Sequence, residues 1–170
     1  MRAYSDAEFD ALYGVQVFEY VAKLDEALRE VHRVLRPGGR VVILATNWSS
    51  VVWRSEQPAR MEQVLSAFAA HAPYPDLPAI LPVQLRQAGM TSVRQTPVPI
   101  LNTSYHANSF SYWLARMIRP FVLSRHVMKQ DEADAWLHEF EDLEQKGGYF
   151  FSSTPIVTEA IKLAEKSKAL

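Results

Sequence analysis

The chain has 170 residues, of which 48% are hydrophobic, 22% charged and 11% aromatic, and this length and composition fit one soluble domain. Its formal net charge is −1, from 18 Lys and Arg against 19 Asp and Glu, so we expect no strongly basic surface for nucleic acid or an anionic membrane. Cysteine is absent, which excludes disulfides, a thiolate nucleophile and cysteine-ligated zinc.

No segment resembles a signal peptide or a membrane span. The first ten residues contain one Arg followed by acidic residues, and no apolar run approaches the roughly 18 residues that a spanning helix needs. We therefore expect a cytoplasmic protein that does not cross a membrane.

The first elements form a strand-helix-strand unit. Residues 9–16 are apolar and aromatic, as in a strand, and from Leu24 apolar residues recur three and four apart, as in an amphipathic helix. The helix is expected to stop at Pro37-Gly38-Gly39, and residues 40–46 then predict a buried parallel strand. A right-handed crossover places the carboxyl ends of the two strands, near Gln16 and Thr46, at one edge of the sheet.

The rest of the chain continues in α/β order. It predicts helices over 58–70, 78–88, 109–123 and 129–146, a strand over 91–101, and a last interrupted strand or hairpin over 149–152 and 156–162. About four strands and five helices result.

The phrase Arg33-Val-Leu-Arg-Pro-Gly-Gly-Arg40, between an amphipathic helix and a Val- and Ile-rich strand, resembles the class I S-adenosylmethionine-dependent methyltransferases. The chain looks most like the small-molecule methyltransferases related to ubiquinone and menaquinone biosynthesis. In that family the phrase joins the helix after strand four to strand five. The resemblance implies the C-terminal portion of a Rossmann-like sheet, mixed, of about four strands. It implies a single domain over 1–170, truncated on its N-terminal side, with an inserted helical cap over 104–146.

The resemblance implies S-adenosyl-L-methionine as cofactor and assigns part of its site to the loop after the first strand, at Gln16, Val17, Phe18 and Tyr20. The residues also permit a strand-end polar cap at Gln16 and simple packing by Tyr20. The family's glycine-rich turn and its ribose-binding acid have no counterpart here, because no two of the six glycines form a Gly-x-Gly pair. Most of the cofactor site is therefore expected outside this chain.

By the same resemblance, the acceptor pocket is lined by Asn47 and Trp48 after the second strand, and by Tyr105, Tyr112 and Trp113 in the cap. A capped turn and an ordinary helix core are the alternatives for these residues. His71 and His106 lie in loops and are candidates for a general base.

No histidine pair has metal-ligand spacing, so no metal is proposed. The acidic residues of the helix over 129–146 are interpreted as a solvated face: Asp131, Glu132, Asp134, Glu139, Glu141, Asp142 and Glu144.

Two functions remain open. The first is methyl transfer to a small-molecule acceptor by a chain that is incomplete as given and is not expected to catalyse alone. The second is a non-catalytic interaction module, or a partner subunit, derived from a methyltransferase fold. In both, the outer edge of the strand over 9–16 lacks a neighbour, and we expect self-association or a second chain there.

Overall fold

The computed structural model describes residues 4–164, and these divide into two compact units. The first unit holds the described residues up to Asn47, Asp76–Val98 and those from Pro155 onward. The second unit holds Trp48–Pro75 and Pro99–Thr154. The cap over 104–146 falls inside the second unit, which also takes in the segment before residue 76. The assignment of residues 1–170 to one domain with an inserted helical cap stays a prediction.

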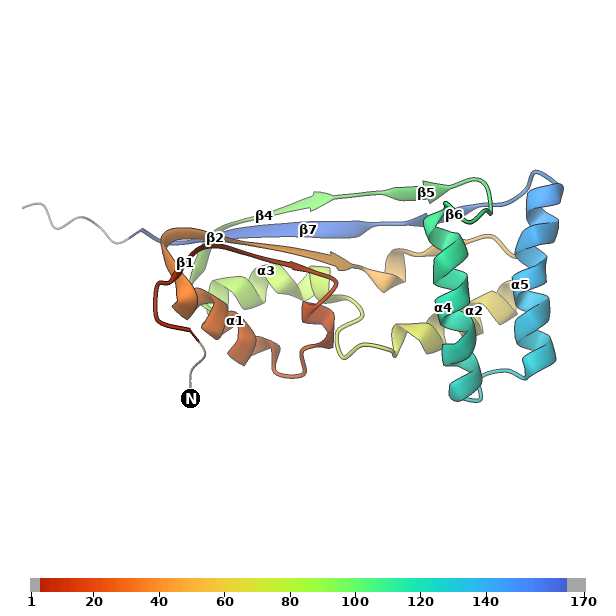
Figure 1. The fold of residues 1–170 in the computed structure, drawn as a ribbon, viewed down its shortest axis with the longest axis horizontal. Coiled ribbons are helices and arrows are strands. Elements are labelled where there is room, and N and C mark those ends of the chain that lie inside the picture. The colour runs from red at the N-terminus through yellow and green to blue at the C-terminus, as the bar shows by residue number, and fades with distance from the viewer. Residues whose placement is uncertain (1–3, 165–170) are drawn as a thin grey trace, which may run out of the picture. The chain divides into compact units, whose positions relative to one another are not determined.

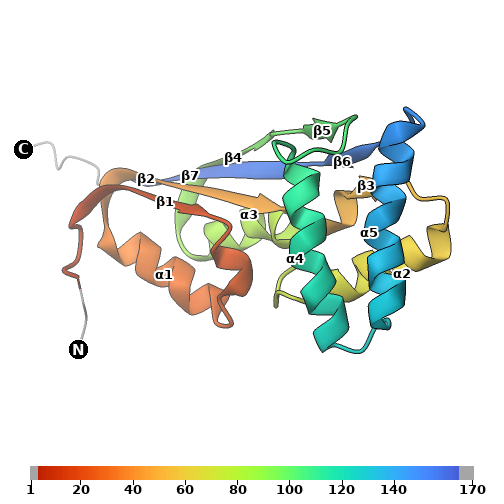
Figure 2. The same ribbon diagram turned by 45° about the vertical axis from the view of Figure 1, so that its right-hand side comes forward.

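The first unit is a mixed four-stranded sheet in the order β1-β2-β7-β4, as Figure 1 shows. β1 and β2 are parallel, whereas β7 is antiparallel to both β2 and β4. Both helices of the unit lie on the same face of the sheet (Figures 1 and 2). The predicted fold class, an α/β fold with a mixed Rossmann-like sheet, is confirmed. The elements are β1 (Phe9–Val15), α1 (Leu24–Val34), β2 (Leu35–Thr46), α3 (Leu77–Gln87), β4 (Met90–Pro97) and β7 (Pro155–Lys162).

The core of the first unit lies between the sheet and its two helices. Val41, Ile43 and Ala45 alternate along β2 and are fully buried, as expected for strand positions that share one face. Leu28 of α1 and Leu81 of α3 are also fully buried. The helix periodicity read from the sequence therefore places the correct apolar stripe against the sheet.

The second unit combines a small sheet in the order β3-β6-β5 with three helices. Its core is aromatic: Trp53 stacks on Phe140 with ring centroids 4.7 Å apart and meets Trp136 and Phe151 edge-on. The sequence did not predict this sheet. The elements are β3 (Val52–Trp53), α2 (Pro58–Ala69), β5 (Ile100–Asn102), α4 (Phe110–Ser124), α5 (Gln130–Gln145) and β6 (Phe151–Ser153).

Two boundaries differ from the sequence prediction. The first helix ends at Val34 and not at Pro37, because Leu35 is already extended and pairs with Phe9, and a residue preceding proline, such as Arg36, favours extended backbone. β2 therefore includes the Pro-Gly-Gly segment. The single strand predicted over 91–101 is instead β4 and β5 in two different sheets, interrupted between Pro97 and Ile100. Likewise, β6 and β7 form no hairpin, since each joins a different sheet.

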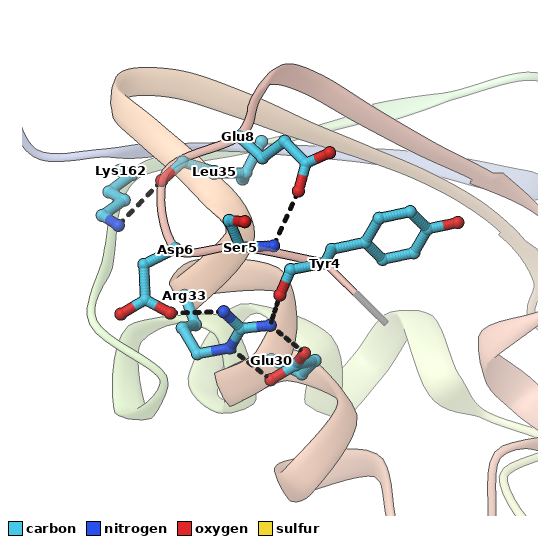
Figure 3. A network of polar contacts seen from close by, with 8 residues as sticks. All are labelled: Tyr4, Ser5, Asp6, Glu8, Glu30, Arg33, Leu35 and Lys162. Carbon is cyan, nitrogen blue, oxygen red and sulfur yellow. Dashed lines mark hydrogen bonds and ion pairs between the residues drawn. The ribbon is translucent and has the colours of Figure 1, made fainter. Parts of the chain in front are cut away.

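Arg33 anchors the segment that leads into β1 (Figure 3). Its guanidinium pairs with the carboxylates of Asp6 and Glu30 and donates to the carbonyl oxygen of Tyr4 at 2.9 Å. The backbone N–H of Ala7 donates to the Arg33 carbonyl at 3.0 Å. The described residues before β1 are thus held against the C-terminal end of α1.

Candidate functional site

The candidate site of the first unit lies at the carboxyl ends of β1 and β2. Because the two strands are parallel and Val15 pairs with Leu44, their following residues come together. Gln16 Nε2 donates to Thr46 Oγ1 at 2.7 Å, and the Gln16 backbone N–H donates to Leu44 at 2.9 Å. Gln16 has φ +53°, a conformation that costs a non-glycine residue free energy. The expected meeting of these two strand ends is confirmed.

The four predicted cofactor contacts do not share one environment. Val17 and Tyr20 are 50% and 49% exposed, whereas Phe18 is buried within a short 3₁₀ turn over Phe18–Tyr20. Burial, and to a smaller extent the charge of Glu19, raises the pKa of the Tyr20 phenol, so its hydroxyl stays protonated. The geometry therefore offers Gln16, Val17 and Tyr20 to a ligand and leaves Phe18 as support beneath the loop.

Glu19 is a feature of this loop that the sequence analysis missed. Its side chain is fully buried, and neither carboxylate oxygen has a hydrogen-bond partner among the described residues. Burial raises the pKa of this carboxyl, partly opposed by its own backbone N–H. The sequence feature that could have indicated it is a single acidic residue within the mostly apolar segment from Val15 to Val21.

The aromatic residues proposed for the acceptor are divided between core and surface. The fifth proposed acceptor residue, Asn47, lies in the first unit, whereas the four aromatic residues lie in the second. Tyr105 is buried, and its hydroxyl accepts a hydrogen bond from Arg116 at 2.8 Å. The Arg116 guanidinium lies 3.4 Å from the centroid of the Tyr112 ring. Trp113 is 58% exposed, with Nε1 donating to Ala107 at 2.7 Å.

The two candidate bases differ in which ring nitrogen is engaged. His71 Nδ1 lies 2.5 Å from the Phe68 carbonyl oxygen, which places the proton on Nδ1 and the lone pair on Nε2. His106 Nδ1 accepts the N–H of Asn108 at 3.1 Å, so its lone pair is already used. The His71 ring also stacks on that of Phe68, with centroids 4.2 Å apart.

A surface groove of about 680 Å³ lies within the second unit. Trp48, Val51 and Leu65 give it apolar walls, and Arg54 and Glu62 add charges. Trp48 also contacts Phe68 and His71 edge-on, with ring centroids 5.1 Å apart in each case. The groove thus adjoins one proposed acceptor residue, Trp48, and its volume is within the range of small-molecule sites.

The prediction that the acidic residues of α5 form a solvated face is wrong for one residue. Glu139 is buried, because its carboxylate pairs with Arg60 and accepts hydrogen bonds from the Ser55 hydroxyl, at 2.6 Å, and the Glu56 backbone N–H. It ties α5 to the start of α2 and is not part of a solvated surface.

Two possible features were not found over residues 4–164. No three side chains among His, Cys, Asp and Glu gather there as metal ligands, and none of the helices described is both long and apolar enough to span a bilayer.

Comparisons with known proteins agree with this fold. Residues 1–43 match the family described as "Methyltransferase domain". Over 40 residues the chain is 35% identical to the sterol 4-C-methyltransferase strm-1 of Caenorhabditis elegans, a match that covers 24% of this chain and 12% of that protein. The chain thus matches only a small part of its curated relative's length.

Two solved structures cover most of the chain. A protein of Bacillus halodurans described as a methyltransferase superposes with a TM-score of 0.55 at 14% identity, covering 96% of this chain and 68% of that one. The YcgJ protein of Bacillus subtilis gives a TM-score of 0.50 at 18% identity, with the same coverage. The chain has the fold of the class I S-adenosylmethionine-dependent methyltransferases, and its first 43 residues carry that family's sequence pattern.

Proposed function

We propose that the chain takes part in methyl transfer from S-adenosyl-L-methionine to a small-molecule acceptor, in the cytoplasm, and supplies one wall of the cofactor site. The observation that carries the proposal is the paired end of β1 and β2, where Gln16 Nε2 donates to Thr46 Oγ1, in a chain whose fold resembles that of a methyltransferase structure. When bound, the cofactor supplies an activated methyl group on a sulfonium.

The chain's residues suit one side of that cofactor. Gln16 uses its amide N–H on Thr46 and retains its carbonyl oxygen as an acceptor, which fits an ammonium group. Val17 and Tyr20 offer half-exposed surface beside it. No Gly-x-Gly turn occurs in the sequence to let a backbone approach the cofactor closely. A second wall must therefore come from residues other than these.

Within the second unit, the acceptor is proposed to contact Trp48, Tyr112 and Trp113, and a role for Asn47 of the first unit stays a prediction. Tyr105, buried and held by Arg116, acts as a positioning residue behind Tyr112. Methyl transfer needs alignment more than a nucleophile on the protein, and His71 is the proposed general base if the acceptor is a hydroxyl.

Among residues 4–164, no strand pairs with the outer edge of β1, and this favours a second candidate function. A chain with a vacant strand position is also suited to serve as a non-catalytic partner subunit or interaction module. The two functions differ in whether the loop after β1 binds cofactor.

Titration with S-adenosylhomocysteine, followed by backbone amide NMR shifts, tests the proposal. At about 1 mM ligand, where even weak binding is populated, we expect shifts confined to residues 16–20 and 46–47. Val17→Asp should abolish them. Val83→Asp, at an equally exposed position on α3, is the matched control and should not. Silent spectra, or shifts only elsewhere, would leave the interaction module as the function.

A further inference from the structure

Arg116 of α4 is a half-buried guanidinium that forms no ion pair with a carboxylate among residues 4–164. Its Nη1 donates to the Tyr105 hydroxyl at 2.8 Å and to the Tyr112 carbonyl at 3.3 Å. Both acceptors are uncharged, since burial raises the pKa of the Tyr105 phenol. Glu144 accepts the backbone N–H of Tyr105 at 2.8 Å but does not pair with Arg116. The positive charge is therefore held in place without being neutralised.

The free edge of Arg116 is the one that binds carboxylates side-on. Its Nε and Nη2 carry no hydrogen bond to a described residue, and neither is a fully buried atom. Arg119, on the same helix, uses the equivalent nitrogens: its Nε and Nη2 donate to Asp134 Oδ1 at 2.8 and 2.5 Å. Asp134 belongs to α5, which lies beside α4 (Figures 1 and 2). In Arg116 the same edge is available to an external anion.

The Arg116 side chain is also ordered before any ligand binds. Its guanidinium lies 3.4 Å from the centroid of the Tyr112 ring, and the buried Tyr105 fixes one nitrogen. By contrast, Arg125 is exposed, lies 5.4 Å from the centroid of Phe121, and makes no side-chain hydrogen bond within the described residues. Arg116 thus loses less conformational entropy on binding an anion than a free surface arginine does.

The surroundings of this charge are apolar and exposed. Trp113 is 58% exposed, and its ring is held by the Nε1 hydrogen bond to Ala107 at 2.7 Å. It meets the Tyr112 ring edge-on with centroids 5.4 Å apart, and Met117, one turn further along α4, is 60% exposed. One fixed cation beside apolar side chains suits a small acid, whereas an anionic lipid surface is bound by clusters of several Lys and Arg.

We propose that Arg116, together with Tyr112 and Trp113, binds the carboxylate or phosphate group of a small apolar acid. Two oxygens of the acid accept from Nε and Nη2, and the aromatic rings contact its apolar body. Tyr105 is the positioning residue that holds Nη1. This inference deepens the proposed function and rests on it in one respect, because it makes such an acid the class of methyl acceptor. Binding of the acid does not itself require the cofactor.

Titration of the full chain with phenylacetate and with phenyl phosphate, followed by NMR, tests the site. The side-chain Nε–H signal of Arg116 and the indole N–H signal of Trp113 are the readouts. At about 10 mM ligand, where millimolar affinity gives a populated complex, we expect both signals to shift. Benzyl alcohol, the neutral probe, should leave the Arg116 signal unchanged. Whichever acid binds more tightly identifies carboxylate or phosphate as the preferred group.

Variants separate the charge from its geometry. Arg116→Gln should weaken binding by about tenfold or more, because hydrogen bonds to a charged group are the strong ones. Arg116→Lys keeps the charge but lacks the paired N–H groups, so it should recover only part of the affinity. Arg125→Gln is the matched control, since Arg125 also lies over an aromatic ring on the surface, and should bind as the wild type does. Far-UV circular dichroism shows whether each variant keeps its fold.

Three results would overturn the proposal: no shift of the Arg116 signal with either acid, equal binding of benzyl alcohol, or unchanged affinity in a folded Arg116→Gln variant. Binding of S-adenosylhomocysteine is read from other signals, those of residues 16–20 and 46–47. The acid site and the cofactor site can therefore fail separately.

Discussion

Gly14 leaves the space that the ring of Phe18 occupies. A β-carbon added at Gly14 would lie 2.6 Å from Cε2 and 2.9 Å from Cδ2 of that ring, closer than real carbon contacts allow. Phe18 is buried and belongs to the turn that follows β1, so it cannot easily move away. The glycine therefore fixes the path by which the chain leaves the strand and enters the candidate site.

Gly14→Ala should destabilise the protein by about 1–3 kcal/mol, the usual cost of overpacking a core. The entropic gain from replacing glycine, about 0.4–1 kcal/mol, is too small to offset it. Urea denaturation of the wild type and the variant measures the difference. Adding Phe18→Leu should recover part of the loss, and an alanine variant as stable as the wild type would show that the ring is free to shift.

Glu19→Gln should stabilise the protein at neutral pH. The raised pKa of Glu19 means that folding favours the protonated carboxyl, so the wild type loses stability as pH rises from the ordinary glutamate value, about 4.3, through the raised one. The glutamine cannot ionise and avoids this loss. Thermal melts from pH 4 to 8 should give the same Tm for both proteins at pH 4. As pH rises, the Tm of the glutamine variant should exceed that of the wild type by a growing margin. A Tm difference that does not change with pH would mean that a partner stabilises the ionised Glu19 carboxylate and offsets the effect of burial.

Local patterns predicted the first unit well. The helix from Leu24 and the strand through Ile43 follow from periodicity, and the Pro-Gly-Gly phrase identified the fold. The pattern over 91–101 could not show two strands, because β4 and β5 differ only in their partners, β7 and β6, which lie far along the chain.

The candidate site was also predicted only in part, because local patterns do not show which distant residues come into contact. The crossover rule predicted that the strand ends near Gln16 and Thr46 lie at one edge of the sheet. The structure confirms this and adds a hydrogen bond between the two side chains. Burial of Glu139 depends on Arg60, 79 residues away, which a helix pattern cannot show. The buried Glu19 carboxylate meets no side chain of another described residue that would pair with it, so no pairing rule could have predicted its burial.

Glu139→Gln should cost about 2 kcal/mol, because it removes the negative charge that accepts from the partly buried Arg60 guanidinium. The amide also cannot accept from Arg60, the Ser55 hydroxyl and the Glu56 N–H together as the carboxylate does. Chemical denaturation measures the loss. Glu141→Gln is the matched control, because Glu141 lies two residues further along α5 and is exposed, and it should change stability by less than about 0.5 kcal/mol. Equal effects from both variants would contradict a buried pair.

Arg33→Lys should loosen the segment before β1 while leaving the sheet intact. A lysine ammonium is a point charge and cannot match the guanidinium that serves Asp6, Glu30 and the Tyr4 carbonyl at once. The amides of Ala7 and Glu8, which donate to Arg33 and Val34, should exchange with deuterium faster in the variant. Amides of β2 and β7 should not change. Arg29→Lys, whose pair with Asp25 lies wholly on the surface of α1, provides the control. If exchange at Ala7 and Glu8 stays at the wild-type rate, the backbone bonds alone hold the segment and the Arg33 contacts are incidental.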